Sequence, residues 1–140
     1  MTMKAGIWID HRKAVIVTIG GGEERTIVLF SAVEKHPERT GDSPMHGRYE
    51  ALQVPADDRR QRALTQALDV FYDAVIDAVL KIESLLICGP GEAKGELRKR
   101  LERKGLGGRI DAVETEDKMT DGQIAAKTRE FFAETPRRAS

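Results

Sequence analysis

Four aspartates stand where metal-dependent chemistry would need them. Asp10 ends the short apolar run AGIWID, and Asp69, Asp73 and Asp77 recur every four residues in a segment with helical periodicity. Carboxylates from a first strand, a first helix and a fourth strand could together hold the two metal ions of a nuclease. The fourth apolar run, SLLICG, carries no acid. Because the carboxylate set is incomplete, we expect no nuclease activity and no metal, and we assign Asp10 to a turn.

The glycine-rich turn Gly89-Pro90-Gly91 lies between a predicted strand and a predicted helix, where phosphate-binding loops also lie. Its spacing to Gly95 misses the dinucleotide motif by one residue, and the Gly-Lys-Ser/Thr of a P-loop is absent. Glu92 falls in the first turn of the following helix, where its carboxylate would repel a phosphate. We therefore interpret this turn as a tight joint between a strand and a helix, and we expect no cofactor.

A strongly basic segment follows this joint. Two acids, Glu96 and Glu102, accompany seven cations there. Helix design explains part of this charge, because cations favour a helix C-terminus and the pairs Glu96–Arg100 and Arg98–Glu102 have i,i+4 spacing. Seven cations exceed that need, so the segment is either a solvated helix face or an anion-binding face, with phosphate backbones the obvious partner. The cations are Lys94, Arg98, Lys99, Arg100, Arg103, Lys104 and Arg109.

Residues 33–56 show no sustained periodicity and contain several prolines and glycines. A loop of this length inside a small domain is usually functional or disordered. Its cations Lys35, Arg39 and Arg48 join the candidate RNA-binding residues. His36 and His46 have no nucleophile or cysteine as a partner, so we expect them to be ordinary loop residues.

The remaining pattern predicts the elements that position these residues. Three β-branched runs with short links, at 5–10, 14–19 and 26–32, indicate an antiparallel meander. Asp57 or Asp58 is expected to cap a long helix, and SLLICG is typical of a strand buried on both faces. The basic helix should run over about 92–104 and end at Gly105. A fifth strand at 109–115 and a last helix opened by a capping box at 120–123 complete the chain.

The predicted order is therefore βββαβαβα. This is the order of the ribonuclease-H-like fold, an α/β fold whose five-stranded mixed sheet carries helices on its faces. At 140 residues the chain suits one domain, which we place at 1–134 with a frayed tail at 135–140. Cys88 cannot form an internal disulfide, and no signal peptide or membrane-length apolar segment is visible. We expect a cytoplasmic protein with no membrane partner.

Several stretches carry a family resemblance. KAGIWIDHRKAVIV, GPGEAKGEL and ETEDKMTD resemble bacterial proteins related to the middle domain of archaeo-eukaryotic release factors and of Pelota. Some of those relatives are labelled translational machinery protein or host attachment protein. The resemblance spans nearly the whole chain and implies a ribonuclease-H-like fold. In release factors the long loop bears a Gly-Gly-Gln tip, which is missing from 33–56, where Gln53 lacks a preceding glycine pair. That departure speaks against peptide release.

Three functions remain open. The first, which we favour, is a non-catalytic translation-associated protein that binds ribosomal RNA or tRNA through the basic helix and the long loop. The second is a hydrolase that acts on an ester bond through the loop, with His36 or His46 as base. The third is a dimeric interaction module without nucleic acid, which would make the protein a homo-oligomer. The basic helix and the neighbouring acidic segment 111–121 could pair within the chain or form a self-complementary surface in the dimer.

Overall fold

The computed structural model describes residues 3–32 and 55–134. The segment 33–54, which holds most of the predicted long loop, and the tail 135–140 lie outside the described residues.

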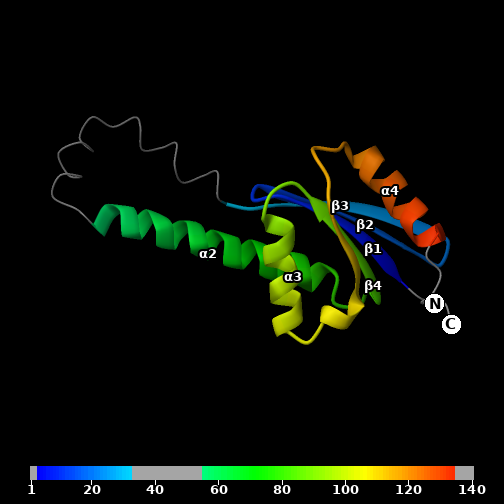
Figure 1. The fold of residues 1–140 in the computed structure, drawn as a ribbon, viewed down its shortest axis with the longest axis horizontal. Helices are drawn as coiled ribbons and strands as arrows, with labels where there is room; N and C mark the ends of the chain where they lie inside the picture. Colours follow the sequence, from blue (N-terminus) through cyan, green and yellow to red (C-terminus); the bar gives the residue numbers. More distant parts are fainter. Residues whose placement is uncertain (1–2, 33–54, 135–140) are drawn as a thin grey trace.

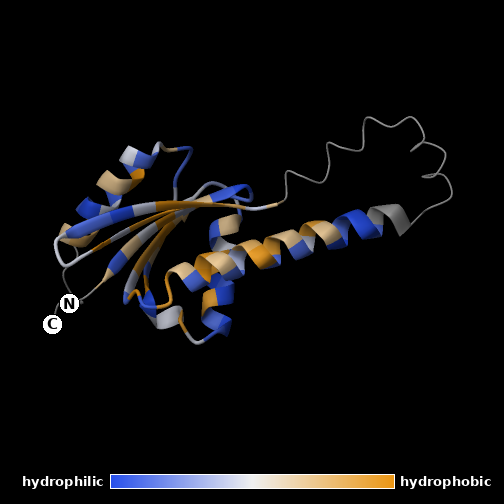
Figure 2. Ribbon diagram, turned by 180° about the vertical axis from the view of Figure 1, so that it is seen from behind, coloured by the Kyte–Doolittle hydropathy of each residue, from blue (hydrophilic) through white to orange (hydrophobic). Residues whose placement is uncertain are grey.

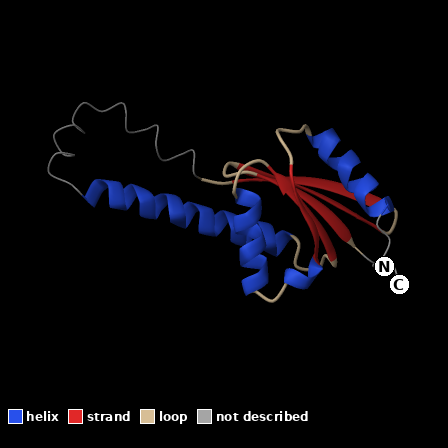
Figure 3. Cartoon of the chain, in the orientation of Figure 1, coloured by secondary structure: helices blue, strands red, loops and turns tan. Residues whose placement is uncertain are grey.

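A single five-stranded mixed sheet forms the centre of the described structure (Figure 3). Its spatial order is β3-β2-β1-β4-β5. Strands β1, β2 and β3 pair antiparallel, whereas β4 pairs parallel with both β1 and β5. This topology confirms the predicted ribonuclease-H-like fold. The strands are Lys4–Ile9 (β1), Lys13–Gly20 (β2), Glu23–Phe30 (β3), Ser84–Gly89 (β4) and Ile110–Thr115 (β5).

Two tight turns build the antiparallel half of the sheet. Asp10 Oδ1 accepts hydrogen bonds from the backbone amides of Arg12 at 2.8 Å and Lys13 at 2.9 Å, which confirms Asp10 as a turn residue. Gly21 and Gly22 have φ angles of 61° and 82°, as a two-residue hairpin turn requires. Pairing therefore resumes at once, and β3 begins at Glu23 and ends at Phe30 rather than spanning 26–32.

In the described residues, three helices flank the sheet: α2 (Pro55–Ala78), α3 (Ala93–Arg103) and α4 (Asp121–Glu134), with a short 3-10 helix, η3 (Gly107–Arg109), before β5. Helix α2 begins at Pro55, so the cap expected at Asp57 or Asp58 was wrong. Proline suits a first helical position because its missing amide hydrogen has no intrahelical partner there. The predicted capping box of α4 is confirmed, since Thr120 and Gln123 exchange backbone-to-side-chain hydrogen bonds of 2.9 and 3.1 Å.

The helices cover the sheet from both sides (Figure 1). On one face, Ile7 and Ile87 pack with Phe71 of α2 and Leu97 of α3. On the other face, Trp8 and neighbouring strand residues pack against Ile124 of α4. Strand β4 is buried along its whole length, as predicted. The first part of α2 extends beyond the sheet and is hydrophilic (Figure 2), and residues 58–62 are exposed there.

Cys88 belongs to the second of these cores and is 1% exposed. Burial raises the pKa of its thiol to about 12, so almost no thiolate is present near neutral pH. We predict that Cys88 does not react with a thiol reagent at about pH 8 in the native protein, and reacts fully in denaturant. Absorbance of the released chromophore measures this directly. Rapid labelling without denaturant would show that this core opens readily.

Among the residues of 3–32 and 55–134, no helix combines the length and the hydrophobicity that crossing a bilayer requires.

Candidate nucleic-acid interface

Helix α3 presents a narrow buried stripe and a broad polar surface. Ala93, Leu97 and Leu101 recur every four residues and are almost fully buried against the sheet and α2. Gly105 follows the helix with a φ of 81°, and the amide of Leu106 donates to the carbonyl of Leu101 at 2.8 Å. This confirms the predicted glycine cap, whose geometry satisfies the last carbonyls of the helix. The remaining α3 side chains face solvent or the neighbouring helix α2.

Arg100 joins α3 to α2. Its guanidinium donates to Asp69 and, at 3.2 Å, to Asp73, and it lies 5.6 Å from the ring centroid of Tyr72. The pair Glu96–Arg100 expected from helical spacing was therefore wrong, because carboxylates on the neighbouring helix offer Arg100 two partners. The other expected pair, Arg98–Glu102, is present at 3.0 Å.

Three further cations are engaged within the fold. Lys94 donates to the carbonyl of Gly91, just before the helix. Lys104 lies 3.9 Å from Asp73 of α2. Arg109 donates to the carbonyls of Leu80 and Ile82, the latter at 3.1 Å, and so holds η3 against the link between α2 and β4. These three cations therefore have a structural role within the fold, which explains part of the positive charge of the segment.

Lys99 and Arg103 remain as the exposed pair of the basic helix. They lie four residues apart, on successive turns of one helix face. Both line a groove of about 350 Å³ between α2 and α3, which Gln61 and Thr65 of α2 also border. We call this the α2–α3 groove. Exposed cations on a groove between two rigid helices are suited to binding phosphate oxygens.

Three arginines lie on the first turns of α2. Arg59, Arg60 and Arg62 are all exposed, and they are close in sequence to Gln61 but on other sides of the helix than the one that borders the α2–α3 groove. These arginines are not among the candidate residues predicted from the sequence. Their signal was the run DDRRQR, which was considered only as the start of a helix.

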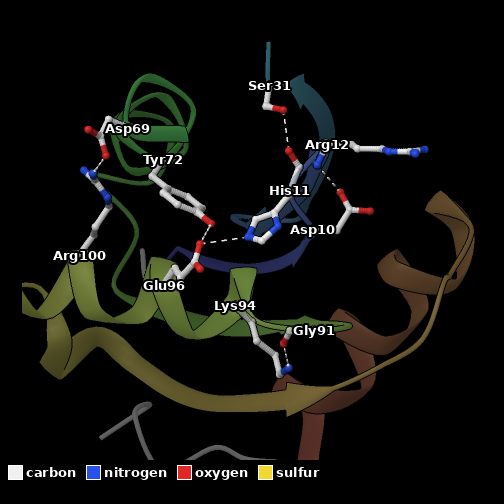
Figure 4. A network of polar contacts seen from close by, with 10 residues as sticks. All are labelled: Asp10, His11, Arg12, Ser31, Asp69, Tyr72, Gly91, Lys94, Glu96 and Arg100. Carbon is white, nitrogen blue, oxygen red and sulfur yellow. Dashed lines mark hydrogen bonds and ion pairs between the residues drawn. The ribbon is translucent and has the colours of Figure 1, made fainter. Parts of the chain in front are cut away.

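A polar network fixes the base of the α2–α3 groove (Figure 4). Glu96 Oε1 accepts a hydrogen bond from the Tyr72 hydroxyl and lies 3.1 Å from His11 Nε2. Burial, and then the contact with Glu96, raises the pKa of Tyr72 above its ordinary value. The phenol therefore stays protonated and remains a donor at physiological pH. Glu96 thereby links α3 both to α2 and to the β1–β2 turn.

Several predicted site residues fall outside the described part of the chain. Lys35, Arg39 and Arg48 lie in 33–54, as do His36 and His46. Within the described residues, no three or more histidine, cysteine, aspartate or glutamate side chains are grouped to hold a metal ion.

Comparison with known proteins identifies the fold. No protein-family model matches the sequence, and no curated protein matches it. Among solved structures, the Pelota protein of Thermoplasma acidophilum matches 99% of this chain with a TM-score of 0.54 and 15% identity. An archaeal translation termination factor matches 94% of it with a TM-score of 0.49 and 14% identity. This chain spans 34% of the length of the first structure and 39% of the second. The likeness to Pelota shows a shared fold.

Proposed function

We propose that this protein is a non-catalytic, translation-associated protein that binds ribosomal RNA or tRNA. In this proposal the α2–α3 groove supplies the described part of the RNA-binding surface, and Lys35, Arg39 and Arg48 contribute from the segment outside it. A cytoplasmic location belongs to the same proposal.

The observation that carries the proposal is the exposed charge around the groove. Lys99 and Arg103 face solvent on adjacent turns, while Arg100 is drawn to the carboxylates of α2. The structural contacts of Arg100 therefore neutralise Asp69 and Asp73, which would otherwise repel a phosphate near the groove. The chain as a whole has a formal net charge of zero, so this positive surface is a local feature.

The link to translation has separate support. The motifs around GPGEAKGEL and ETEDKMTD resemble relatives of release factors and Pelota, and the fold is shared with Pelota. The absence of a Gly-Gly-Gln tripeptide from the sequence favours a binding role over peptide release. Asp10 is held in a backbone turn, and β4 carries no carboxylate, which disfavours two-metal nuclease chemistry.

Co-sedimentation with purified ribosomes tests this function. We expect the protein to pellet with ribosomes at low salt and to be released as the salt concentration rises, because cations that bind phosphates displace counterions. Sedimentation without ribosomes at each salt concentration is the control for aggregation. A protein that stays in the supernatant at low salt, or that pellets equally at every salt concentration, would contradict the proposal.

A further inference from the structure

A second hollow, of about 550 Å³, opens where the parallel strands end. Its walls come from the β1–β2 turn, from the end of β3, from Pro90 after β4 and from residues 117–118 after β5. In the sheet, β2 and β3 follow one another outward on one side of β1, and β4 and β5 follow one another outward on its other side. The strand order therefore reverses between β1 and β4. Ligands of open α/β sheets bind at such a position, outside the carboxyl ends of the strands where the order reverses. The volume falls in the range of small-molecule sites.

An exposed aromatic ring stands at the rim of this hollow. Phe30 is 74% exposed, the largest fraction among the exposed large hydrophobic side chains of the described chain. Its backbone is well fixed, since Phe30 pairs with Lys13 across the hairpin and the next amide, of Ser31, donates to the Arg12 carbonyl at 2.8 Å. The Ser31 hydroxyl also donates to the His11 carbonyl at 2.6 Å. An aromatic ring that faces solvent from a fixed backbone position offers a platform on which an unpaired base can stack.

The charges around this ring favour an anion. Arg12, Lys13 and Lys118 line the hollow together with Asp10 and Asp117. Both carboxylates are used by the backbone, because Asp10 Oδ1 accepts two turn amides and Asp117 Oδ1 accepts the amide of Lys118 at 2.9 Å. Their negative charge is therefore partly balanced by backbone donors. With these carboxylates held by backbone donors, the ammonium groups of Lys13 and Lys118 are the charges placed to meet an anion.

The hollow and the α2–α3 groove are neighbours. His11 lines the hollow, Glu96 lines the groove, and their side chains are 3.1 Å apart (Figure 4). One strand of nucleic acid that follows the groove would therefore reach the hollow with its next nucleotides.

We propose that this hollow binds an unpaired RNA nucleotide, whose base stacks on Phe30 and whose phosphate contacts Lys13 and Lys118. The proposal takes its partner from the RNA-binding function above and adds the preference for single strands. A base inside a duplex is already stacked and paired, so it cannot cover Phe30. Poly-glutamate would satisfy the cations but has no flat ring to place on the Phe30 ring.

The single tryptophan provides a direct readout. Trp8 lines the hollow, with Lys13 Nζ 5.9 Å from its ring centroid, so filling the hollow should change its fluorescence. We expect poly(U) to change Trp8 emission, and Phe30→Ala to weaken poly(U) binding at least about fivefold. The salt dependence of binding should be unchanged, because stacking releases no counterions. Phe30→Tyr should bind like the wild type, since tyrosine keeps the ring.

Ile27→Ala is the matched control, because Ile27 is an exposed hydrophobic residue on the same strand, 42% exposed. Poly(U) affinity that is equal in Phe30→Ala, Ile27→Ala and wild type would overturn the nucleotide site and leave ribosome binding intact. Equal losses for poly(U) and for duplex RNA would also overturn it, as would stronger binding of poly-glutamate than of poly(U). The two proposals can also fail separately. If the protein does not bind ribosomes but uridine monophosphate changes its Trp8 emission, the nucleotide site in the hollow is supported and the function proposed for the groove is refuted.

Discussion

Replacing Gly89 with alanine is expected to lower the free energy of unfolding by about 3 kcal/mol, a large fraction of the stability of a small domain. Gly89 ends β4 with a φ of 148°, a conformation that L residues rarely adopt. A Cβ at this position would overlap the carbonyl oxygen of Ile9, at the end of the paired strand β1. Backbone atoms in a central strand cannot move aside as a flexible side chain can. Urea denaturation followed by circular dichroism measures the change.

Two nearby glycines provide graded controls. Gly91 has a φ of 65°, but a Cβ added there would have no atom within 4 Å, so Gly91→Ala should cost only about 1 kcal/mol of backbone strain. Gly95 lies inside α3 with no positive φ and open space around it, so Gly95→Ala should stabilise the protein by about 0.5–1 kcal/mol. If Gly89→Ala unfolds at the same urea concentration as Gly91→Ala, the close approach to Ile9 is not what fixes this residue.

These glycines also show why the fold could be predicted from the sequence. The β-branched runs, the glycine turn at 20–22 and the capping box at Thr120 each act locally, and each local preference agrees with the final topology. The joint at Gly89–Gly91 was interpreted as structural for the same reason. The boundary errors at the start of α2 and of β3 have local causes: Pro55 suits a first helical position, and the two-residue turn at Gly21 and Gly22 lets strand pairing resume at Glu23.

The candidate site could be predicted only in part. The basic character of α3 is visible in the sequence, but the division of its cations between structure and surface depends on the neighbouring helix. Arg100 has a suitable partner in Glu96 by spacing, and Asp69 and Asp73 become better placed only after α2 and α3 pack together. The hollow beside Phe30 is lined by residues from four separate segments, so no motif within a single segment predicts it.

Changing Lys99 and Arg103 together to glutamine is expected to weaken ribosome binding at low salt by about 2 kcal/mol, or roughly thirtyfold, at about 1 kcal/mol for each lost phosphate contact. The slope of log affinity against log salt should flatten by about two, because each contact releases about one counterion. Stability should be unchanged, since both side chains are exposed on the α2–α3 groove. Binding titrations at several salt concentrations give both quantities.

Matched variants separate the groove from total charge. Arg25→Gln with Lys81→Gln removes the same two charges from exposed positions on β3 and after α2, so its salt slope should equal that of the wild type. Arg100→Gln should lower the free energy of unfolding by about 1 kcal/mol, because its ion pairs with Asp69 and Asp73 are largely exposed on the carboxylate side. Arg100→Gln should change the salt slope of binding less than the double variant of Lys99 and Arg103 does. If the two double variants lose affinity equally, the binding follows net charge alone, and α3 is a solvated helix face.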